Sequence, residues 1–395
     1  MKFVTPSTRP IDLGVAVFGE RDRLASEMAG AILDAAAELG VRSRLITAPD
    51  ALGELTYLIG INRPRGLAEL LAASRTPHRL IWFGEPLPPA VEVREGTPSR
   101  VRSRVFSLGR QAVSALPRGR ARTAVSRLGG PMADLEPWDN LRAAVRLAGL
   151  AEFVVTSRDG AQILSAAGVQ SRTVPFGYTP KLHGPLTLDG SRDIETLVLG
   201  GFSGPRSRRR RRIVGALRRR GLRVTLADGV WGEERNLLLR RSRVVLQVHR
   251  FPGTFIGSRL LLAIAAGAVV VTEPMTDPYP FVPDVHFIQA PLESLLAETR
   301  ALLADEDRRR RIALAGQELL AGDLSMTRCL HNVLARLDVE RAGEIAQDPA
   351  AQGSKERTAE ITSSISDSVS PGKSGSVTIR SQADSVTGRL RAYAR

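Results

Sequence analysis

The sequence predicts an α/β protein with two Rossmann-like domains facing a cleft, followed by a disordered C-terminal tail. Short apolar segments alternate with longer segments of helical periodicity, which is typical of parallel, doubly wound sheets. The alternation starts a second time after a polar break at residues 179–193. Residues 342–395 contain ten serines and one aromatic residue, Tyr393. Such a segment cannot bury enough apolar surface to offset the entropy of ordering it.

The first domain is expected over residues 1–178. Its first strand is predicted at 13–18, before Gly19, and a helix follows at 24–39 with Gly40 as its cap. Further short strands are predicted at 41–47, 55–61, 80–83, 153–156 and 173–174. A basic amphipathic segment at 96–130 interrupts the pattern. It either lies on an anionic membrane surface or packs against the core with a solvated basic side.

The second domain is expected over residues 179–340, and the tail over 341–395. Strands are predicted at 196–199, 224–227, 244–248 and 268–272. Gly221 ends a helix over 208–220, and Gly267 ends a helix over 258–266. A final helix is predicted at 325–337.

The composition fits an intracellular two-domain protein. The chain has 395 residues, of which 43% are hydrophobic. Its longest apolar run, 260–272, is shorter than the roughly 20 residues that span a bilayer. The first ten residues carry no secretion signal. The single cysteine, Cys329, excludes an internal disulfide framework and is expected to be a buried thiol. We therefore expect a cytoplasmic protein, with the inner face of the membrane as a candidate peripheral site.

The charge is positive and unevenly distributed. The net charge is +15, and residues 200–260 contain sixteen arginines against Asp228, Glu233 and Glu234. Such a field favours anionic ligands, namely phosphate esters, nucleic acid or anionic lipid. Aromatic residues make up only 5% of the chain and are not interleaved with the arginines, so specific nucleic-acid binding is not expected.

Several short motifs follow one another in order between residues 13 and 320. They occupy residues 81–89, 155–158, 174–178, 199–201, 208–212, 230–235, 245–249, 251–253, 259 and 265–267. In this order and spacing they resemble bacterial glycosyltransferases of the spore-maturation-protein-like branch, whose C-terminal half is of the glycosyl transferases group 1 type. The resemblance implies the GT-B architecture. It also implies that the second domain binds a nucleotide-diphosphate sugar as co-substrate and that the first binds a hydroxyl acceptor, on a glycan, a lipid-linked molecule or a small molecule.

One departure from the resembled family concerns its acidic residues. Related retaining transferases carry two glutamates before the turn at 265–267, and by register these fall near Thr254 or Ile256 and at Leu262. Neither position is acidic here. The resemblance therefore implies that the carboxylate that binds the ribose of the donor is either missing or supplied from elsewhere, with Glu273 as the candidate.

The candidate donor site lies where the strands of the second domain end. The glycine-rich turn after residue 199 offers backbone N–H groups to a diphosphate, and arginine side chains clamp phosphate oxygens. An imidazole at a strand end can bind sugar or phosphate, and an indole can lie against a nucleobase. The donor-binding candidates are Gly200, Gly201, Phe202, Ser203, Arg208, Trp231, His249, Arg259 and Glu273.

Two carboxylates of the first domain are candidate catalytic residues. Glu20 and Glu85 follow predicted strands, next to Gly19 and Trp82, and either can act as general base on an acceptor hydroxyl if the reaction inverts. A retaining reaction needs no such base. No metal site and no cofactor are expected, because metal-ligand spacing is absent.

Three alternatives remain open at this point. The first is a non-catalytic GT-B-like binding protein, which the absent glutamates favour. The second is a basic protein that binds nucleic acid or a membrane surface. The third is a nucleotide-sugar epimerase of the same fold.

Overall fold

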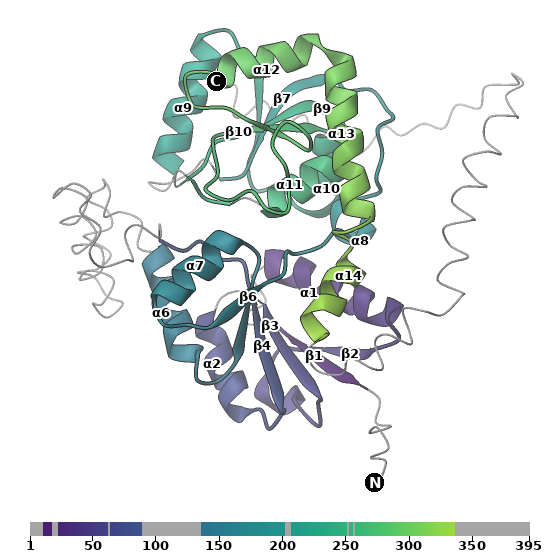
Figure 1. Ribbon diagram of the computed structural model, residues 1–395. Helices are drawn as coiled ribbons and strands as arrows, with labels where there is room; N and C mark the ends of the chain where they lie inside the picture. Colours follow the sequence, from purple (N-terminus) through teal and green to yellow (C-terminus); the bar gives the residue numbers. More distant parts are fainter. Residues whose placement is uncertain are drawn as a thin grey trace, which may run out of the picture. The chain divides into compact units, whose positions relative to one another are not determined.

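The computed structural model describes residues 11–17, 23–61, 64–88, 136–201, 207–250, 253–255 and 257–335 (Figure 1). The predicted amphipathic segment 96–130 and the predicted tail 341–395 lie outside these residues. The chain divides into two compact units, Met1–Leu330 and His331–Arg395, with the boundary inside the last helix. The account below concerns the first unit, which contains two parallel sheets. We call residues 11–178 the first lobe and residues 179–324 the second lobe.

The first lobe contains a parallel sheet of six described strands in the order β2-β1-β3-β4-β5-β6. The strands are β1 (Asp12–Ala16), β2 (Arg42–Ile46), β3 (Tyr57–Ile61), β4 (His78–Phe83), β5 (Glu152–Val155) and β6 (Ser171–Thr173). They alternate with α1 (Arg23–Glu38), η1 (Pro49–Ala51), α2 (Pro64–Ala73), α6 (Glu136–Leu147) and α7 (Arg158–Ala166). Because β3 is buried along its whole length, it reads as a continuous apolar run.

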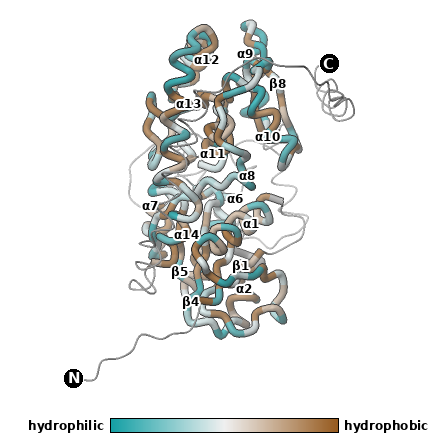
Figure 2. The backbone as a smooth tube through the Cα atoms, turned by 90° about the vertical axis from the view of Figure 1, so that its right-hand side faces the viewer, coloured by the Kyte–Doolittle hydropathy of each residue, from teal (hydrophilic) through white to brown (hydrophobic). Residues whose placement is uncertain are grey.

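The second lobe contains a parallel sheet of five described strands in the order β11-β10-β9-β7-β8. The strands are β7 (Ile194–Leu199), β8 (Val224–Ala227), β9 (Ser242–Gln247), β10 (Val269–Thr272) and β11 (Ile288–Gln289). The helices are α9 (Arg208–Arg219), α10 (Gly232–Arg240), α11 (Gly257–Ala265), α12 (Leu295–Ala304) and α13 (Glu306–Ala321). Apolar side chains of α9, α12 and α13 share one core with β7, β9 and β10. Figure 2 shows the alternation of apolar and polar segments along the backbone.

The prediction of two Rossmann-like sheets is confirmed, and most predicted elements lie within two residues of their observed ends. The predicted polar break at 179–193 contains a short helix, α8 (Pro180–His183), which a proline at its start favours. Helices α2, α6, α7, α10, α12 and α13 had not been predicted individually. The last described helix, α14 (Met326–Leu334), is shorter than the predicted 325–337.

The chain returns to the end of the first lobe before α14 begins. The backbone N–H of Tyr178 donates to the carbonyl of Leu324 at 2.6 Å, and that of Met326 donates to the carbonyl of Tyr178 at 2.7 Å. Gly177 lies beside this contact, where a Cβ atom would come within 2.5 Å of Met326 Cα. A side chain therefore does not fit at residue 177.

A buried ion pair joins α10 to α1. Arg235, whose side chain is 3% exposed, donates to Glu27 Oε2 at 2.7 Å and to the carbonyl of Leu182 at 2.9 Å. Glu27 also accepts from the backbone N–H of Gly232 at 3.1 Å. The buried guanidinium is thus fully used in fixing this junction.

Two further observations bear on the expectations from composition. Cys329 is buried, as predicted, and burial raises the pKa of its thiol to about 12. Among the described helices, none has both the length and the hydropathy that crossing a membrane requires.

Candidate functional site

Four strands of the second sheet bring polar residues to one edge. Because the strands are parallel, their carboxyl ends meet there, where ligands of open α/β sheets bind. Gly200 follows β7, Asp228 follows β8, His249 follows β9 and Glu273 follows β10. The first turns of α9 and α11 contribute arginines to the same edge.

Gly200 lets two guanidinium groups approach the backbone. Its φ is +116°, a conformation that only glycine adopts readily. A Cβ atom at this position would lie 3.1 Å from Arg210 Nη1 and 3.2 Å from Arg259 Nη2. Gly200 is therefore required both by its backbone conformation and by the space that Arg210 and Arg259 occupy.

The first turn of α9 directs two arginines inward. Arg209 donates to both carboxylate oxygens of Glu273, at 2.7 Å to Oε2, and to the carbonyl of His249 at 2.7 Å. Arg210 donates to the carbonyl of Gly201 at 3.0 Å and, less closely, to that of Val248. Both arginines thus order the backbone at the strand ends.

Arg208, the candidate chosen from the sequence, is exposed. The helical spacing had indicated that only one or two arginines of residues 208–212 face inward. The structure brings Arg209 and Arg210, rather than Arg208, to the strand ends.

Arg259, in the first turn of α11, has no hydrogen-bond or ion-pair partner in the described part of the chain, although it is partly buried. Its burial, and after that the nearby positive charges of Arg210 and Arg250, lower the pKa of its guanidinium to about 9. Arg250 itself pairs with Glu136 at 2.7 Å. We call Arg210, Arg250 and Arg259 the arginine cluster. Three like charges at short range favour an anionic ligand.

His249 is 1% exposed and lies beside the arginine cluster. Its Nε2 shares a 2.7 Å hydrogen bond with Thr272 Oγ1, while its buried Nδ1 has no partner in the described part of the chain. Burial lowers the pKa of the imidazole to about 4, so the ring is neutral at pH 7. Its free nitrogen can therefore form a hydrogen bond with a ligand.

Glu273 is 4% exposed and belongs to the same network. Its carboxylate accepts from Arg209 and from the backbone N–H of His249 at 2.8 Å. Burial opposes its ionisation, but these hydrogen bonds outweigh burial and hold the pKa of Glu273 below its usual value. Glu273 therefore fixes Arg209 and the loop at His249.

The remaining candidate residues are either more exposed than these or lie outside the described residues. Gly201 is exposed at the mouth of the turn, and its carbonyl accepts from Ser207 Oγ at 2.8 Å. Trp231 is 37% exposed and precedes α10. Phe202, Ser203 and Glu20 lie outside the described residues. Their proposed roles stay predictions.

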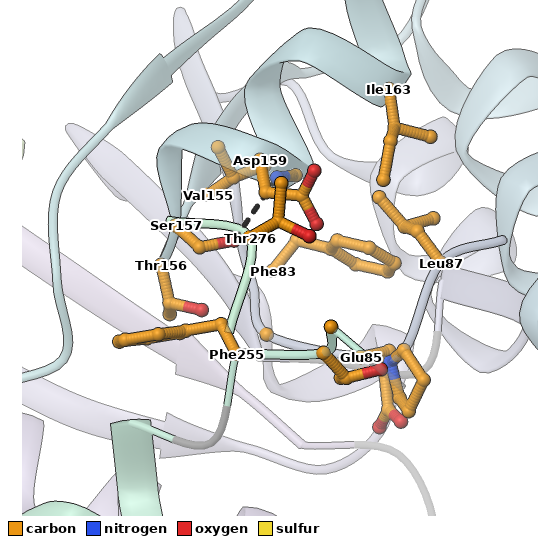
Figure 3. Close-up of a pocket in the computed structure, with 15 residues that line it drawn as sticks. Phe83, Glu85, Leu87, Val155, Thr156, Ser157, Asp159, Ile163, Phe255 and Thr276 are labelled. Atoms are coloured by element: carbon orange, nitrogen blue, oxygen red, sulfur yellow. Dashed lines mark hydrogen bonds between the residues drawn. The ribbon is translucent and has the colours of Figure 1, made fainter. Parts of the chain in front are cut away.

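A cavity of about 240 Å³ contains the catalytic candidate Glu85 (Figure 3). Its wall combines the loop after β4, the start of α7 and residues 253–255 with Thr276. Hydroxyl groups of Thr156, Ser157 and Thr276 and the ring of Phe255 line it. Asp159, in the first turn of α7, is a second carboxylate of this wall that had not been predicted. Burial, and after that the charge of Asp277, raise its pKa.

The position where related transferases carry a glutamate is occupied by an apolar side chain. Leu262 is 7% exposed and lines a second cavity of about 100 Å³, whose lining includes Phe176 and Phe281 as well as Arg235 and His183. No acid nearby takes the place of the glutamate of the related transferases, since none is among the described residues that line this cavity.

Sequence reasoning did not single out Arg209, Arg210, Arg250 or Asp159. Strand ends followed by charged residues were the available signal for Arg250 and Asp159. No group of three or more His, Cys, Asp or Glu side chains that could hold a metal is present among the described residues.

Two parallel α/β lobes, with an arginine-lined strand edge in the second, define a protein of the GT-B class. Residues 206–335 match the profile of a family described as glycosyl transferase-like. The match agrees with the predicted class of glycosyltransferase and covers most of the second lobe together with α14. The finer relation to the spore-maturation-protein-like branch stays a prediction.

Several solved structures of the same fold align with most of this chain. Anabaena HepE, solved with UDP and glucose, is 12% identical with a TM-score of 0.53, covering 83% of this chain and 100% of its own. Sucrose-phosphate synthase from Thermosynechococcus elongatus is 14% identical with a TM-score of 0.51, covering 82% and 97%. An alpha-glucosyltransferase solved with UDP and DNA is 8% identical with a TM-score of 0.51, covering 82% and 98%. No curated protein sequence matches the chain significantly.

Proposed function

We propose that the chain transfers a sugar from a nucleotide-diphosphate sugar to a hydroxyl acceptor, with the donor diphosphate bound at the arginine cluster. The observation that carries this proposal is that Arg210 and Arg259 both lie beside Gly200, with Arg259 lacking an acidic partner in the described chain. Guanidinium groups bind phosphate oxygens through charge-assisted hydrogen bonds and stabilise a leaving diphosphate. HepE, which shares the fold, was solved with UDP and glucose, and this supports a donor of the same class.

In this proposal each residue of the edge has a distinct role. Arg259 binds the diphosphate, and Arg210 orders the Gly200–Gly201 turn beside it. His249, neutral at pH 7, offers Nδ1 to a hydroxyl of the donor. Glu273 is a positioning residue that holds Arg209 and the backbone of His249. The ribose-binding role that the resemblance implied for Glu273 competes with these hydrogen bonds for its two oxygens.

The acceptor is proposed to enter the 240 Å³ cavity that the loop after β4 and the start of α7 form with residues 253–255 and Thr276. Its hydroxyl and aromatic lining suits a hydroxylated molecule. Glu85 or Asp159 then takes the proton of the attacking hydroxyl if the reaction inverts. Comparing Glu85→Gln with Asp159→Asn shows which carboxylate is the base. Only substitution of the base is expected to lower kcat strongly while leaving donor affinity intact. Equal, small effects of both variants would favour a retaining mechanism.

A thermal-shift series with nucleoside diphosphates and their sugars tests donor binding. A ligand that binds only the native state raises the melting midpoint as its concentration rises. We expect at least one nucleoside diphosphate to do so with the wild type and less with Arg259→Ala. Arg310→Ala, an exposed arginine of α13, is the matched control and should behave as the wild type. No shift with any nucleotide would contradict the proposal.

The described lining of the cavity at Leu262 contains no acidic residue, and this favours one alternative, a protein that binds the nucleotide sugar without transferring it. Incubation with the donors identified by thermal shift, with and without candidate acceptors, discriminates between the two. Release of nucleoside diphosphate supports transfer or hydrolysis, whereas binding without turnover supports the alternative. Conversion of the donor sugar without acceptor would instead identify an epimerase.

A further inference from the structure

The outward side of α9 is formed by arginines. Residues three and four positions apart share one side of a helix, and on this side α9 has Arg208, Arg211, Arg212, Arg218 and Arg219, all exposed. Its opposite side buries Arg210, Val214 and Leu217. Gly215 lies in the middle of the exposed row. We call these five arginines the α9 basic face.

Four of the five arginines of this face have no acidic ion-pair partner in the part of the chain that the structure describes. Residues 207–223 contain no acidic residue. In the described chain, no ion pair joins Arg208, Arg212, Arg218 or Arg219 to an acid, while Arg223, farther along, pairs with Glu195 at 3.2 Å. Arg300 of α12 adds a cation at the end of α9, where it donates to the carbonyl of Arg220 at 2.6 Å. In Figure 2 the arginine-rich part of α9 has the hydrophilic colour.

This arrangement lowers the stability of the helix itself. Cations near a helix N-terminus oppose the helix dipole, and α9 has no acidic residue in its first turn. Like charges three and four residues apart repel one another, and a glycine inside a helix costs about 0.5–1 kcal/mol relative to alanine. A polyanion lying against the face would relieve the repulsion.

We propose that the α9 basic face binds the surface of a bilayer that contains anionic phospholipids. The face is the convex outer side of a single helix, and its arginines are long enough to reach a common plane from their shared side. It contains no aromatic residue on which a nucleobase could stack. The complementarity is therefore one of charge alone, as with juxtamembrane basic segments that adsorb to anionic lipids.

This binding would be peripheral and sensitive to salt. The face presents no exposed apolar side chain for insertion, since Ile213 is only partly exposed and Val214 and Leu217 are buried. Electrostatic attraction to a charged surface falls off within about a Debye length, roughly 8 Å at physiological ionic strength. Adsorption would thus place the second lobe at the membrane without embedding it. The inference does not depend on the identity of the donor or on catalysis.

Sedimentation of the full chain with lipid vesicles tests the proposal. We expect binding to vesicles of phosphatidylcholine with phosphatidylglycerol, weaker binding in high salt, and little binding to phosphatidylcholine alone. Arg212→Gln, Arg218→Gln and Arg219→Gln combined should lower the partition coefficient roughly one hundredfold, since each arginine near an anionic surface contributes about a fivefold factor. The matched control replaces three exposed arginines elsewhere, Arg146, Arg310 and Arg311, with glutamine.

A second variant guards against a folding defect. Lysine at positions 212, 218 and 219 retains the charge and should retain vesicle binding, whereas glutamine should not, with similar melting midpoints for both. Equal losses in the α9 variant and the control would overturn the proposal, as would absence of binding to anionic vesicles. Binding of duplex DNA that the α9 variant loses, in the absence of vesicle binding, would assign the face to nucleic acid instead and also overturn it.

Discussion

The backbone N–H of His249 donates to Glu273 Oε2 at 2.8 Å, which ties the end of β9 to the end of β10. Arg209 closes this link, because it donates both to Glu273 and to the carbonyl of His249. The loop beside the arginine cluster is therefore shaped by a network whose centre is one buried carboxylate.

Replacing Glu273 with glutamine should destabilise the protein. The substitution removes the negative charge that Arg209 faces, and weakening charge-assisted hydrogen bonds of this kind is expected to cost about 1.5–3 kcal/mol. Chemical denaturation of Glu273→Gln, Arg209→Gln and the double variant would measure the coupling between them. Additive losses would show that the two side chains do not stabilise the loop together.

Alanine substitution should distinguish Gly200 from Gly201. At Gly200 a Cβ atom meets Arg210 and Arg259, and the backbone is in a conformation that costs other residues about 1–3 kcal/mol. At Gly201 the nearest atom is 3.8 Å away, an ordinary contact. We expect Gly200→Ala to lower both stability and nucleotide affinity, and Gly201→Ala to be the milder of the two. Calorimetry and nucleotide titration of both variants would check this, and the reverse order would be inconsistent with the geometry.

Loss of the guanidinium of Arg259 should separate ligand affinity from stability. In Arg259→Gln the affinity for the nucleoside diphosphate is expected to fall roughly 10- to 100-fold, as for loss of a charge-assisted hydrogen bond. The melting midpoint of the unliganded protein should stay the same or rise, because a positive charge beside Arg210 and Arg250 is removed. A large fall in the unliganded midpoint would mean that Arg259 has a structural role instead.

Acidification should destabilise the protein through its buried histidines. Burial lowers the pKa values of His183 and His249 from 6.5 to about 4. Between these values the unfolded chain takes up protons that the folded chain does not, so the free energy of unfolding falls as pH falls. The expected slope is about 1.4 kcal/mol per pH unit for each histidine.

Denaturation curves collected from pH 7 to pH 4.5 would measure that slope. His249→Asn should have a shallower pH dependence than the wild type, because it lacks one of the neutral buried rings. A slope unchanged in His183→Asn and in His249→Asn would contradict the assignment of the pH dependence to these side chains.

The sequence was sufficient for the architecture but not for the identity of the inward-facing arginines. Alternating apolar strands and glycine-ended helices, such as 208–220 before Gly221, predicted the doubly wound sheets, because burial of a parallel sheet leaves continuous apolar runs. Periodicity alone could not say which of five consecutive arginines faces inward. That choice depends on how α9 lies across the strand ends, and the structure selects Arg209 and Arg210.

In the candidate site, too, some residues could be predicted from the sequence and others could not. His249, Arg259 and Gly200 were predicted from their places at strand ends and at the start of a helix, and the structure brings all three to one edge. Glu273 was predicted there as a ligand, but its hydrogen bonds to Arg209 and His249 favour a supporting role. Asp159 was missed because its place in the wall of the cavity that Glu85 also lines depends on contacts between segments that are far apart in the chain.

The hydrogen bonds between Tyr178 and residues 324–326 have a consequence for biosynthesis. During translation the first lobe emerges from the ribosome long before Leu324 and Met326 exist, so the backbone groups of Tyr178 wait for partners that are made only after the second lobe. Maturation of the first lobe is thereby coupled to synthesis of the second. A nascent chain stalled ahead of α14 should be more sensitive to protease around Tyr178 than one released at full length.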